Sequence, residues 1–248
     1  MNKLTAIFIL SLGSLASCEE RKEMPAMSQK SSQPANDRAA AAKAHVRPAL
    51  EHDLNAAGLK FGDSVFIRAF KEERQLELFV RHRPSGKFQL FRTYKVAASS
   101  GGPGPKLLED DGQVPEGFYF VPPPAMNPNS QYHLSFNIGY PNKFDRAHGR
   151  TGSAIMIHGN SVSIGCLAMT DGKIEEIYTL CDAAHAGGQE FFRVHIFPFR
   201  MTNGMMEANT GSKWKSFWEN LKQGYDQFEK SGIPPEVTVE NRRYVFAP

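Results

Sequence analysis

A histidine and a cysteine in the middle of the chain have the residue types of a base and a nucleophile. Residues 154–169 read AIMIHGNSVSIGCLAM, in which His158 ends an apolar run and Cys166 follows a short polar segment. The run is short enough for a buried strand, and a hairpin-like loop would then bring Cys166 back toward His158. The thiolate is the attacking form of cysteine, and a neighbouring imidazole can accept its proton.

The residues before Cys166 can also support the chemistry of an acyl transfer. Gly165 has no side chain, which allows the nearby backbone N–H groups to point at a developing oxyanion. The backbone from Ser163 to Gly165 is therefore the candidate oxyanion site. The residue types alone leave a structural alternative open, in which His158 is a hydrogen-bonded strand-end histidine and Cys166 a small buried hydrophobe.

Several motifs resemble those of the YkuD-type L,D-transpeptidase family. IHG at 157–159 followed by S-x-G-C at 163–166 is similar to the family's IHG and [ST]-H-G-C segments. VPEGFY at 114–119 looks like the family's T-P-x-G-x-[FY] motif, with Val in place of Thr. Residues 132–180 look closer still to the YafK-like branch, and the resemblance extends from about Phe66 to the C-terminal YVF.

This resemblance implies a fold, a reaction and a substrate class. The fold would be α+β, a β-rich YkuD-type sandwich with helices added at both ends. Cys166 would attack the carbonyl of an L,D-peptide bond in a peptidoglycan stem peptide and form a thioester, and His158 would carry the proton to the leaving amine. An amine would then resolve the thioester, and the reaction requires no metal or organic cofactor.

Two departures from the family pattern keep other functions open. The chain has Ile164 where a second histidine is usual and Ala168 where a polar residue is usual. These two departures affect the expected attack of the acceptor amine on the thioester more than the formation of the thioester. A cysteine amidase that cuts cross-links or protein–wall linkages with water is therefore a rival. A third alternative is a non-catalytic wall-binding lipoprotein.

The segment before the apolar run carries candidate substrate contacts. Arg146, His148 and Arg150 lie among glycines in residues 142–153, and Tyr140 ends the predicted strand before them. Arginine can bind a carboxylate through two hydrogen bonds, so this loop is a candidate binding site for a substrate carboxylate. A solvated loop is the alternative, and a metal site built from His148, His158 and Cys166 lacks the usual ligand spacing.

The first residues predict export and a lipid anchor. Residues 1–18, MNKLTAIFILSLGSLASC, have the lysine, apolar run and small residues of a secretory signal, and the run is too short to span a membrane. LASC resembles the bacterial lipobox, which implies cleavage before Cys18 and its lipidation. Glu19, in place of Asp, implies the outer membrane of a Gram-negative bacterium, facing the periplasm. Ordinary cleavage nearby is the alternative.

Composition and net charge limit the classes of partner that can be expected. The 248 residues carry a net charge of +3 without a basic, aromatic-rich cluster, so no nucleic acid is expected as a partner. The expected partners are peptidoglycan stem peptides and, through the lipid, a membrane. A wall-attached protein is a further candidate.

Periodicity and composition divide the chain into five parts. These are a signal peptide (1–17), a tether (18–43), a helix (44–62), a catalytic domain (63–200) and a C-terminal helical extension with an edge strand (201–248).

Within these parts, the pattern predicts the individual elements. They are a β-meander over 65–96, strands over 132–140 and 191–200, and a helix over 171–186. Cys181 lies on the apolar stripe of that helix and is predicted to pack, as is His195 in the last strand. An aromatic stripe from Trp214 to Phe228 predicts a docked helix, with glycan stacking as the alternative.

Overall fold

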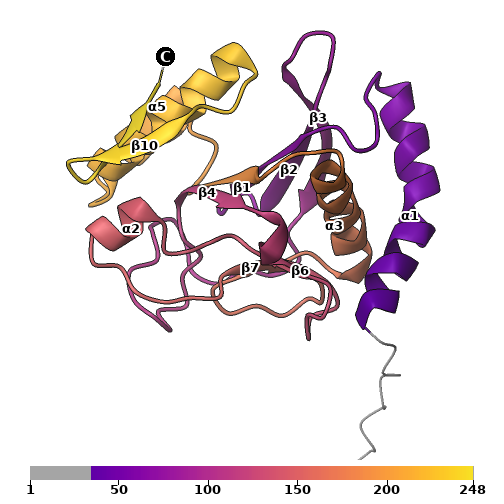
Figure 1. Cartoon of the computed structure of the whole chain (residues 1–248). Helices are drawn as coiled ribbons and strands as arrows, with labels where there is room; N and C mark the ends of the chain where they lie inside the picture. Colours follow the sequence, from indigo (N-terminus) through magenta and orange to yellow (C-terminus); the bar gives the residue numbers. More distant parts are fainter. Residues whose placement is uncertain (1–34, 248) are drawn as a thin grey trace, which may run out of the picture. The chain divides into compact units, whose positions relative to one another are not determined.

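The computed structural model describes residues 35–247, which fold around a five-stranded sheet of order β3-β2-β1-β9-β4 (Figure 1). The predicted meander is confirmed, and its strands pair antiparallel. β9 lies parallel to β1 and antiparallel to β4. The strands are β1 (Val65–Phe70), β2 (Gln75–Arg81), β3 (Phe88–Lys95), β4 (Gly117–Val121) and β9 (Phe192–Phe197).

The central strand β1 separates two cores. All six of its residues are buried, and alternate side chains point to opposite faces. Val65, Ile67 and Ala69 belong to the larger core, whereas Phe66 and Phe70 belong to aromatic clusters on the other face. The sheet is therefore covered on both sides.

A second sheet shares the larger core. Its order is β5-β6-β7-β8, and Phe136, Ile157 and Leu167 from it pack in the same cluster as the inner face of β1. The strands are β5 (Met126–Asn127), which follows the short helix η1 (Pro123–Ala125), β6 (Ser135–Asn137), β7 (Met156–His158) and β8 (Leu167–Ala168). The predicted α+β class, β-rich with two sheets around a core, is confirmed, although the strand expected over 132–140 is only three residues long.

Two helices cover this core along one side. α3 (Asp171–Ala186) has the predicted bounds and buries Cys181 completely, as its apolar stripe predicts. α1 (Ala35–Ala56) packs on α3, with Leu50 and Leu54 buried and Lys43 paired to Asp182 at 3.0 Å.

The bounds of α1 correct the expected tether. Residues 35–43 belong to the helix, because a run of alanines has the highest helix propensity and Ala42 is buried against the core. The helix ends at Ala56, before the expected residue 62. The signal peptide over 1–17 and Cys18 lie outside the described residues. Among residues 35–247, no helix is long and apolar enough to cross a membrane.

The C-terminal segment covers the other face of the five-stranded sheet. Trp218, Tyr225 and Phe228 of its main helix are buried in the aromatic clusters, which confirms packing as the role of that stripe. The predicted edge strand is instead a separate antiparallel hairpin. The elements are α4 (Asn203–Ala208), α5 (Lys215–Ser231), β10 (Val237–Glu240) and β11 (Arg243–Phe246).

Candidate active site

β7, which ends at His158, and β8, which begins directly after Cys166, run parallel, and this corrects the expected hairpin-like return. Ile157 is in register with Leu167, and His158 with Ala168. The carbonyl of His158 accepts a hydrogen bond of 2.8 Å from Met169 N. Residues 159–166 therefore cross back to the start of β7, so Cys166 lies level with Met156.

This crossover is short and depends on a close backbone approach at Gly159. A Cβ at Gly159 would lie 2.6 Å from the carbonyl oxygen of Tyr132 and 2.7 Å from Asp171 Oδ1, so no side chain fits there. The loop is held to the start of α3, because Asp171 Oδ1 accepts from Asn160 N at 2.7 Å. Gly159 thus allows the end of β7 to lie directly against Tyr132 and Asp171.

His158 and Cys166 face the same side of the β7–β8 pair. The register partners Ile157 and Leu167 both point into the larger core. Because side chains alternate along a strand, the flanking residues His158 and Cys166 face the opposite side. They are diagonal neighbours on adjacent strands, roughly 8 Å apart between Cα atoms.

The hydrogen bond of His158 fixes its tautomer and leaves Nε2 able to accept a proton. Its Nδ1 lies 2.6 Å from the carbonyl oxygen of Gly159, which can only accept, so Nδ1 carries the proton and Nε2 is free to accept one. Tyr132 lies against the ring, with 4.7 Å between centroids. Burial lowers the pKa of His158, although the bond to Gly159 opposes this, and the imidazole is neutral at pH 7.

Cys166 is half-buried and rests as a thiol. Its Sγ accepts a hydrogen bond from Met156 N at 3.4 Å and donates to the Ala154 carbonyl at 3.8 Å. Burial raises the pKa of the thiol, and the Met156 N–H and the charge of Lys106 only partly offset this. Neither Cys166 nor Cys181 is in a disulfide. The site therefore starts from a neutral thiol and a neutral imidazole.

The candidate oxyanion donors are engaged by two serines. Cys166 N donates to Ser163 Oγ at 3.1 Å, and Ser163 Oγ donates to the Cys166 carbonyl at 2.7 Å. Gly165 N donates to Ser100 Oγ at 2.6 Å, and φ at Gly165 is +81°, a conformation that favours glycine. Each N–H group thus points at a serine hydroxyl oxygen. The oxyanion of a bound substrate can take the place of that oxygen as the hydrogen-bond acceptor.

A small cavity next to Cys166 contains a lysine that the sequence analysis did not single out. The cavity has a volume of about 90 Å³ and is lined by Cys166, Lys106, Glu109, Asp110 and Ile164, among others. Lys106 is buried, and its Nζ bonds Leu108 O at 2.8 Å and Asp111 Oδ1 at 2.9 Å. No sequence motif marks this lysine, because its place beside Cys166 arises from the path of a Gly- and Pro-rich loop.

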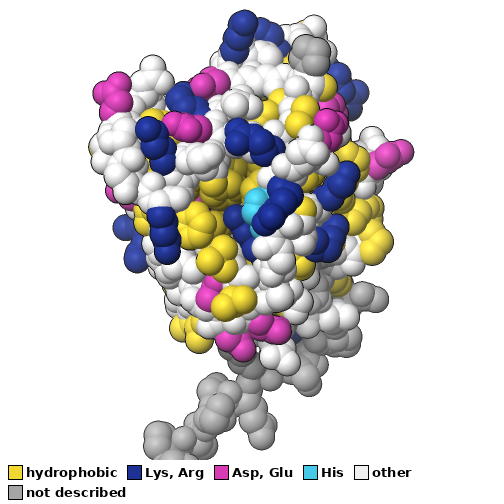
Figure 2. All heavy atoms as spheres, turned by 90° about the vertical axis from the view of Figure 1, so that its left-hand side faces the viewer, with side chains coloured by type: hydrophobic (Ala, Val, Ile, Leu, Met, Phe, Trp, Pro, Cys, Tyr) yellow, Lys and Arg dark blue, Asp and Glu magenta, His cyan; other side chains and the backbone are white. Residues whose placement is uncertain are grey.

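A larger groove meets the small cavity at Ser153 and Ala154, which line both. The groove has a volume of about 900 Å³ and runs from these residues past Met156 and Arg146 to Phe120. Arg146 is exposed on the short helix α2 (Lys143–Ala147), which lies in the segment expected to be a loop. Figure 2, seen from the side on which α2 lies in Figure 1, shows Lys and Arg side chains around an apolar hollow.

The other three candidate substrate contacts have structural roles. Arg150 is buried, bonds Asp145 Oδ1 at 2.8 Å and stacks on Phe144 at 5.0 Å. His148 caps α2 through the carbonyl of Phe144 at 2.9 Å. The buried Tyr140 hydroxyl lies 3.3 Å from Lys106 O. This corrects the expectation for Arg150 in particular, because its charge is already paired with a buried carboxylate.

The structure does not bring the rival metal ligands together. Among residues 35–247, no group of three or more His, Cys, Asp or Glu side chains is placed to hold a metal ion. His148 is instead stacked on Phe144, with 4.2 Å between ring centroids.

Comparisons with known proteins identify the family of the chain. The profile of the YkuD family, the L,D-transpeptidase catalytic domain, matches residues 64–227. The chain is 48% identical over 186 residues to the "Putative L,D-transpeptidase YafK" of Escherichia coli K12, covering 75% of each chain.

Two solved structures are also similar. The cell shape determining protein Pgp2 of Campylobacter jejuni has 18% identity and a TM-score of 0.44, over 77% of this chain and 80% of that one. Bd1075 of Bdellovibrio bacteriovorus has 22% identity and a TM-score of 0.40, over 72% and 78%.

The raised pKa of Cys166 predicts slow alkylation at neutral pH. The rate of reaction with iodoacetamide should rise with pH to a midpoint above the ordinary 9.0 of the thiol. Lys106→Met should move the midpoint higher still, because the charge of Lys106 stabilises the thiolate. Lys173→Met, which removes an ammonium bonded to Lys95 O, is the matched control and should change nothing. A wild-type midpoint below 9.0 would contradict the assignment.

The two arginines should respond differently to truncation. Arg150→Ala should lower the free energy of unfolding by about 3–5 kcal/mol, because it leaves the buried Asp145 without its cation. Arg146→Ala should leave stability unchanged but reduce kcat/KM on muropeptides about ten- to a hundredfold. Thermal denaturation and steady-state kinetics of both variants test this pair. Full activity in Arg146→Ala would show that this side chain holds no substrate.

Proposed function

Because this chain belongs to the YkuD family of L,D-transpeptidase catalytic domains, we propose that it acts on peptidoglycan stem peptides through a thioester at Cys166. The observation that carries the proposal is the placement of His158 and Cys166 on one face of the β7–β8 pair. The groove that passes Met156 and Ala154 leads to this face.

The first step transfers an acyl group to the thiol. Cys166 turns away from the Ala154 carbonyl, Sγ attacks the carbonyl carbon of the substrate, and the thiol proton passes to Nε2 of His158. The tetrahedral oxyanion replaces a serine hydroxyl as the acceptor for Cys166 N–H or Gly165 N–H. The C–N bond then breaks, His158 Nε2 protonates the leaving amine, and the thioester remains.

The two cavities suggest separate places for the two substrates. The larger groove accommodates the stem peptide, with a carboxylate on the exposed guanidinium of Arg146. The smaller cavity carries Glu109 and Asp110, which attract the ammonium form of the acceptor. This ammonium loses a proton to Nε2 of His158, and the neutral amine then attacks the thioester and releases the Cys166 thiolate, which takes the proton back. Resolution of the thioester by that amine completes a transpeptidation.

The size of the small cavity favours hydrolysis as a second candidate. About 90 Å³ is below the ~300–1,000 Å³ of a typical small-molecule site, so the cavity admits water more readily than a second stem peptide. Ile164, at the position where the family usually has a histidine, is 84% exposed and makes part of the wall apolar. The enzyme would then be an amidase that cuts L,D cross-links or protein–peptidoglycan linkages.

Turnover of defined muropeptides, followed by mass analysis of the products, tests the proposal. Cys166→Ala should abolish turnover and covalent trapping by a carbapenem-type acylating agent, and the double variant with His158→Ala should be no worse, because the two act as a unit. The buried Cys181→Ser is the control and should retain activity. A new amide in the products indicates transpeptidation, whereas a free carboxylate indicates hydrolysis.

The pH profile adds a check on the base. Since His158 must be neutral and burial lowers its pKa from 6.5, the acid limb of kcat/KM should lie below pH 6.5. Turnover by Cys166→Ala would show that another group is the nucleophile. The absence of both turnover and trapping in the wild type would leave a non-catalytic wall-binding role.

We also propose that the mature chain is anchored through lipid on Cys18 and faces the periplasm, with the outer membrane as its site. The support is the signal-like segment and the LASC sequence at 15–18. Two or more acyl chains anchor a protein stably, whereas one binds reversibly. Cys18→Ala should abolish metabolic labelling with a fatty acid and release or stall the precursor. Labelling that persists in Cys18→Ala would disprove the anchor.

A further inference from the structure

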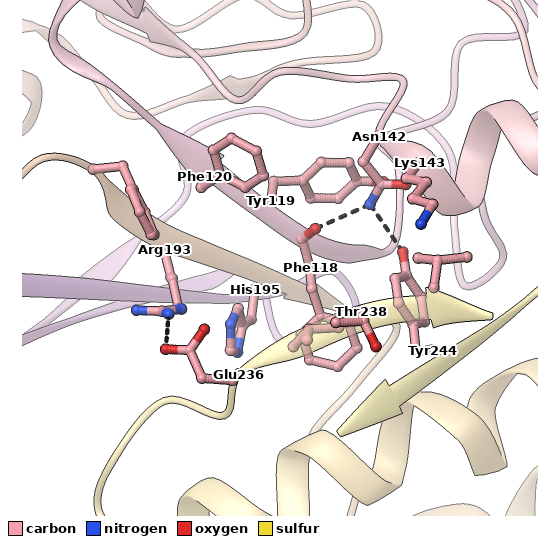
Figure 3. Close-up of a pocket in the computed structure, with 13 residues that line it drawn as sticks. Phe118, Tyr119, Phe120, Asn142, Lys143, Arg193, His195, Glu236, Thr238 and Tyr244 are labelled. Carbon is pink, nitrogen blue, oxygen red and sulfur yellow. Dashed lines mark hydrogen bonds and ion pairs between the residues drawn. The ribbon is translucent and has the colours of Figure 1, made fainter. Parts of the chain in front are cut away.

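A further pocket, distinct from the small cavity and the groove, lies between the edge of the five-stranded sheet and the C-terminal hairpin (Figure 3). It has a volume of about 390 Å³, which falls in the usual range for small-molecule sites. Its walls come from β4, β9, α2 and the β10–β11 hairpin, and neither His158 nor Cys166 lines it. The acyl-transfer mechanism makes no use of this pocket.

The pocket contains a buried histidine without hydrogen-bond partners. His195 is 1% exposed, and neither of its ring nitrogens has a partner among the described residues. Its ring lies between those of Phe66 and Phe118, at 4.7 Å from each centroid. A buried polar group without a partner destabilises the fold, so its presence in a pocket wall points to a ligand that supplies the missing bonds.

The protonation state of His195 limits what such a ligand can be. Burial, with Arg193 and Arg68 nearby, holds the pKa of His195 well below 6.5. The neutral ring therefore offers one N–H donor and one acceptor. A ligand with an amide carbonyl next to a hydroxyl group has the complementary acceptor and donor.

The rest of the pocket suits a sugar ring. Phe120 is 57% exposed and Phe191 36% exposed, and their rings lie 5.5 Å apart to form an apolar platform. Arg193 and Glu236 form an ion pair at one side of His195, and Thr238 lies across from them (Figure 3). The C–H face of a pyranose packs on aromatic rings, whereas its hydroxyl groups require polar partners at the edge.

The pocket also adjoins the groove that leads to the active site. Phe120 lines both the pocket and the groove, and the groove continues past Arg146 to Met156. A ligand in the pocket could therefore be covalently linked to a peptide in the groove. Phe120, on the last part of β4, is the wall between the two.

We propose that this pocket binds an N-acetylated hexosamine of the glycan strand, on the same molecule whose stem peptide enters the groove. The acetamido carbonyl accepts from the ring N–H of His195, a hydroxyl of the sugar donates to the other ring nitrogen, and the sugar ring packs on Phe120 and Phe191. The identity of the polymer rests on the proposed function. The pocket would therefore select sugar-linked stem peptides over free ones.

Binding can be measured without turnover in the full mature chain carrying Cys166→Ala. Titration with N,N′-diacetylchitobiose should show saturable binding by calorimetry or NMR, whereas cellobiose, which has no amide, should bind at least about tenfold more weakly. Adding Phe191→Ala should weaken chitobiose binding about tenfold through the loss of ring stacking. Leu90→Ala removes a partly exposed apolar side chain at the far edge of the sheet and is the matched control. No binding, or equal binding by the Phe191 variant, overturns the proposal.

His195→Leu separates a ligand contact from a structural role. Because the ring nitrogens have no partners within residues 35–247, this change should leave the melting temperature equal or higher while chitobiose binding is lost. Unchanged chitobiose affinity in a folded His195→Leu protein overturns the proposal. Phe191→Ala decides the question if His195→Leu does not fold.

Kinetics distinguish failure of this proposal from failure of the proposed function. In the enzyme with Cys166 intact, a disaccharide-linked stem peptide should have a KM about tenfold below that of the free peptide, and Phe191→Ala should remove the difference. Turnover of both substrates with equal KM overturns the sugar site and leaves the cysteine chemistry standing. No turnover of either substrate overturns the proposed function, and the sugar-linked substrate with it.

Discussion

The parallel pairing of β7 with β8 is the constraint on which the active site depends. Ile157 and Leu167 pack side by side in the larger core, and this fixes the register of the two strands. A shift of one residue would turn His158 and Cys166 into the core. Hydrophobic packing on one face of the strands therefore holds the proposed catalytic pair on the other face.

The segment before β4 completes the site from a distant part of the sequence. Ala97 N and Ala168 N form backbone hydrogen bonds with Ala168 O and Ala98 O, which adds this segment to the edge of β8. From there Ser100 reaches Gly165, and Lys106 reaches the cavity beside Cys166. The Cys166 thiol is thus positioned by the loop that precedes it, and the charge of Lys106, from the segment before β4, lowers its pKa.

Buried charges connect this second loop to the C-terminal helix. Lys71 Nζ bonds Gly104 O at 2.6 Å and Val114 O at 2.7 Å and pairs with Glu116 at 3.2 Å. Glu116, completely buried, also accepts from Trp218 Nε1 at 2.8 Å. Breaking a buried network of this kind leaves an uncompensated charge, so α5 and the loop are coupled energetically. The C-terminal segment is for this reason part of the catalytic fold.

The sequence alone indicated the proposed nucleophile, its proposed base and most elements, because these depend on local order. The apolar run before His158, Gly165 before Cys166, and the stripes of α3 and α5 are all visible in the residues themselves. Only the tertiary structure decided the direction of β8, the burial of Arg150 against Asp145, the presence of Lys106 beside Cys166 and the unpartnered ring of His195. These depend on contacts between residues far apart in the chain, and a residue's type does not reveal whether another segment will satisfy its charge or leave it in a pocket.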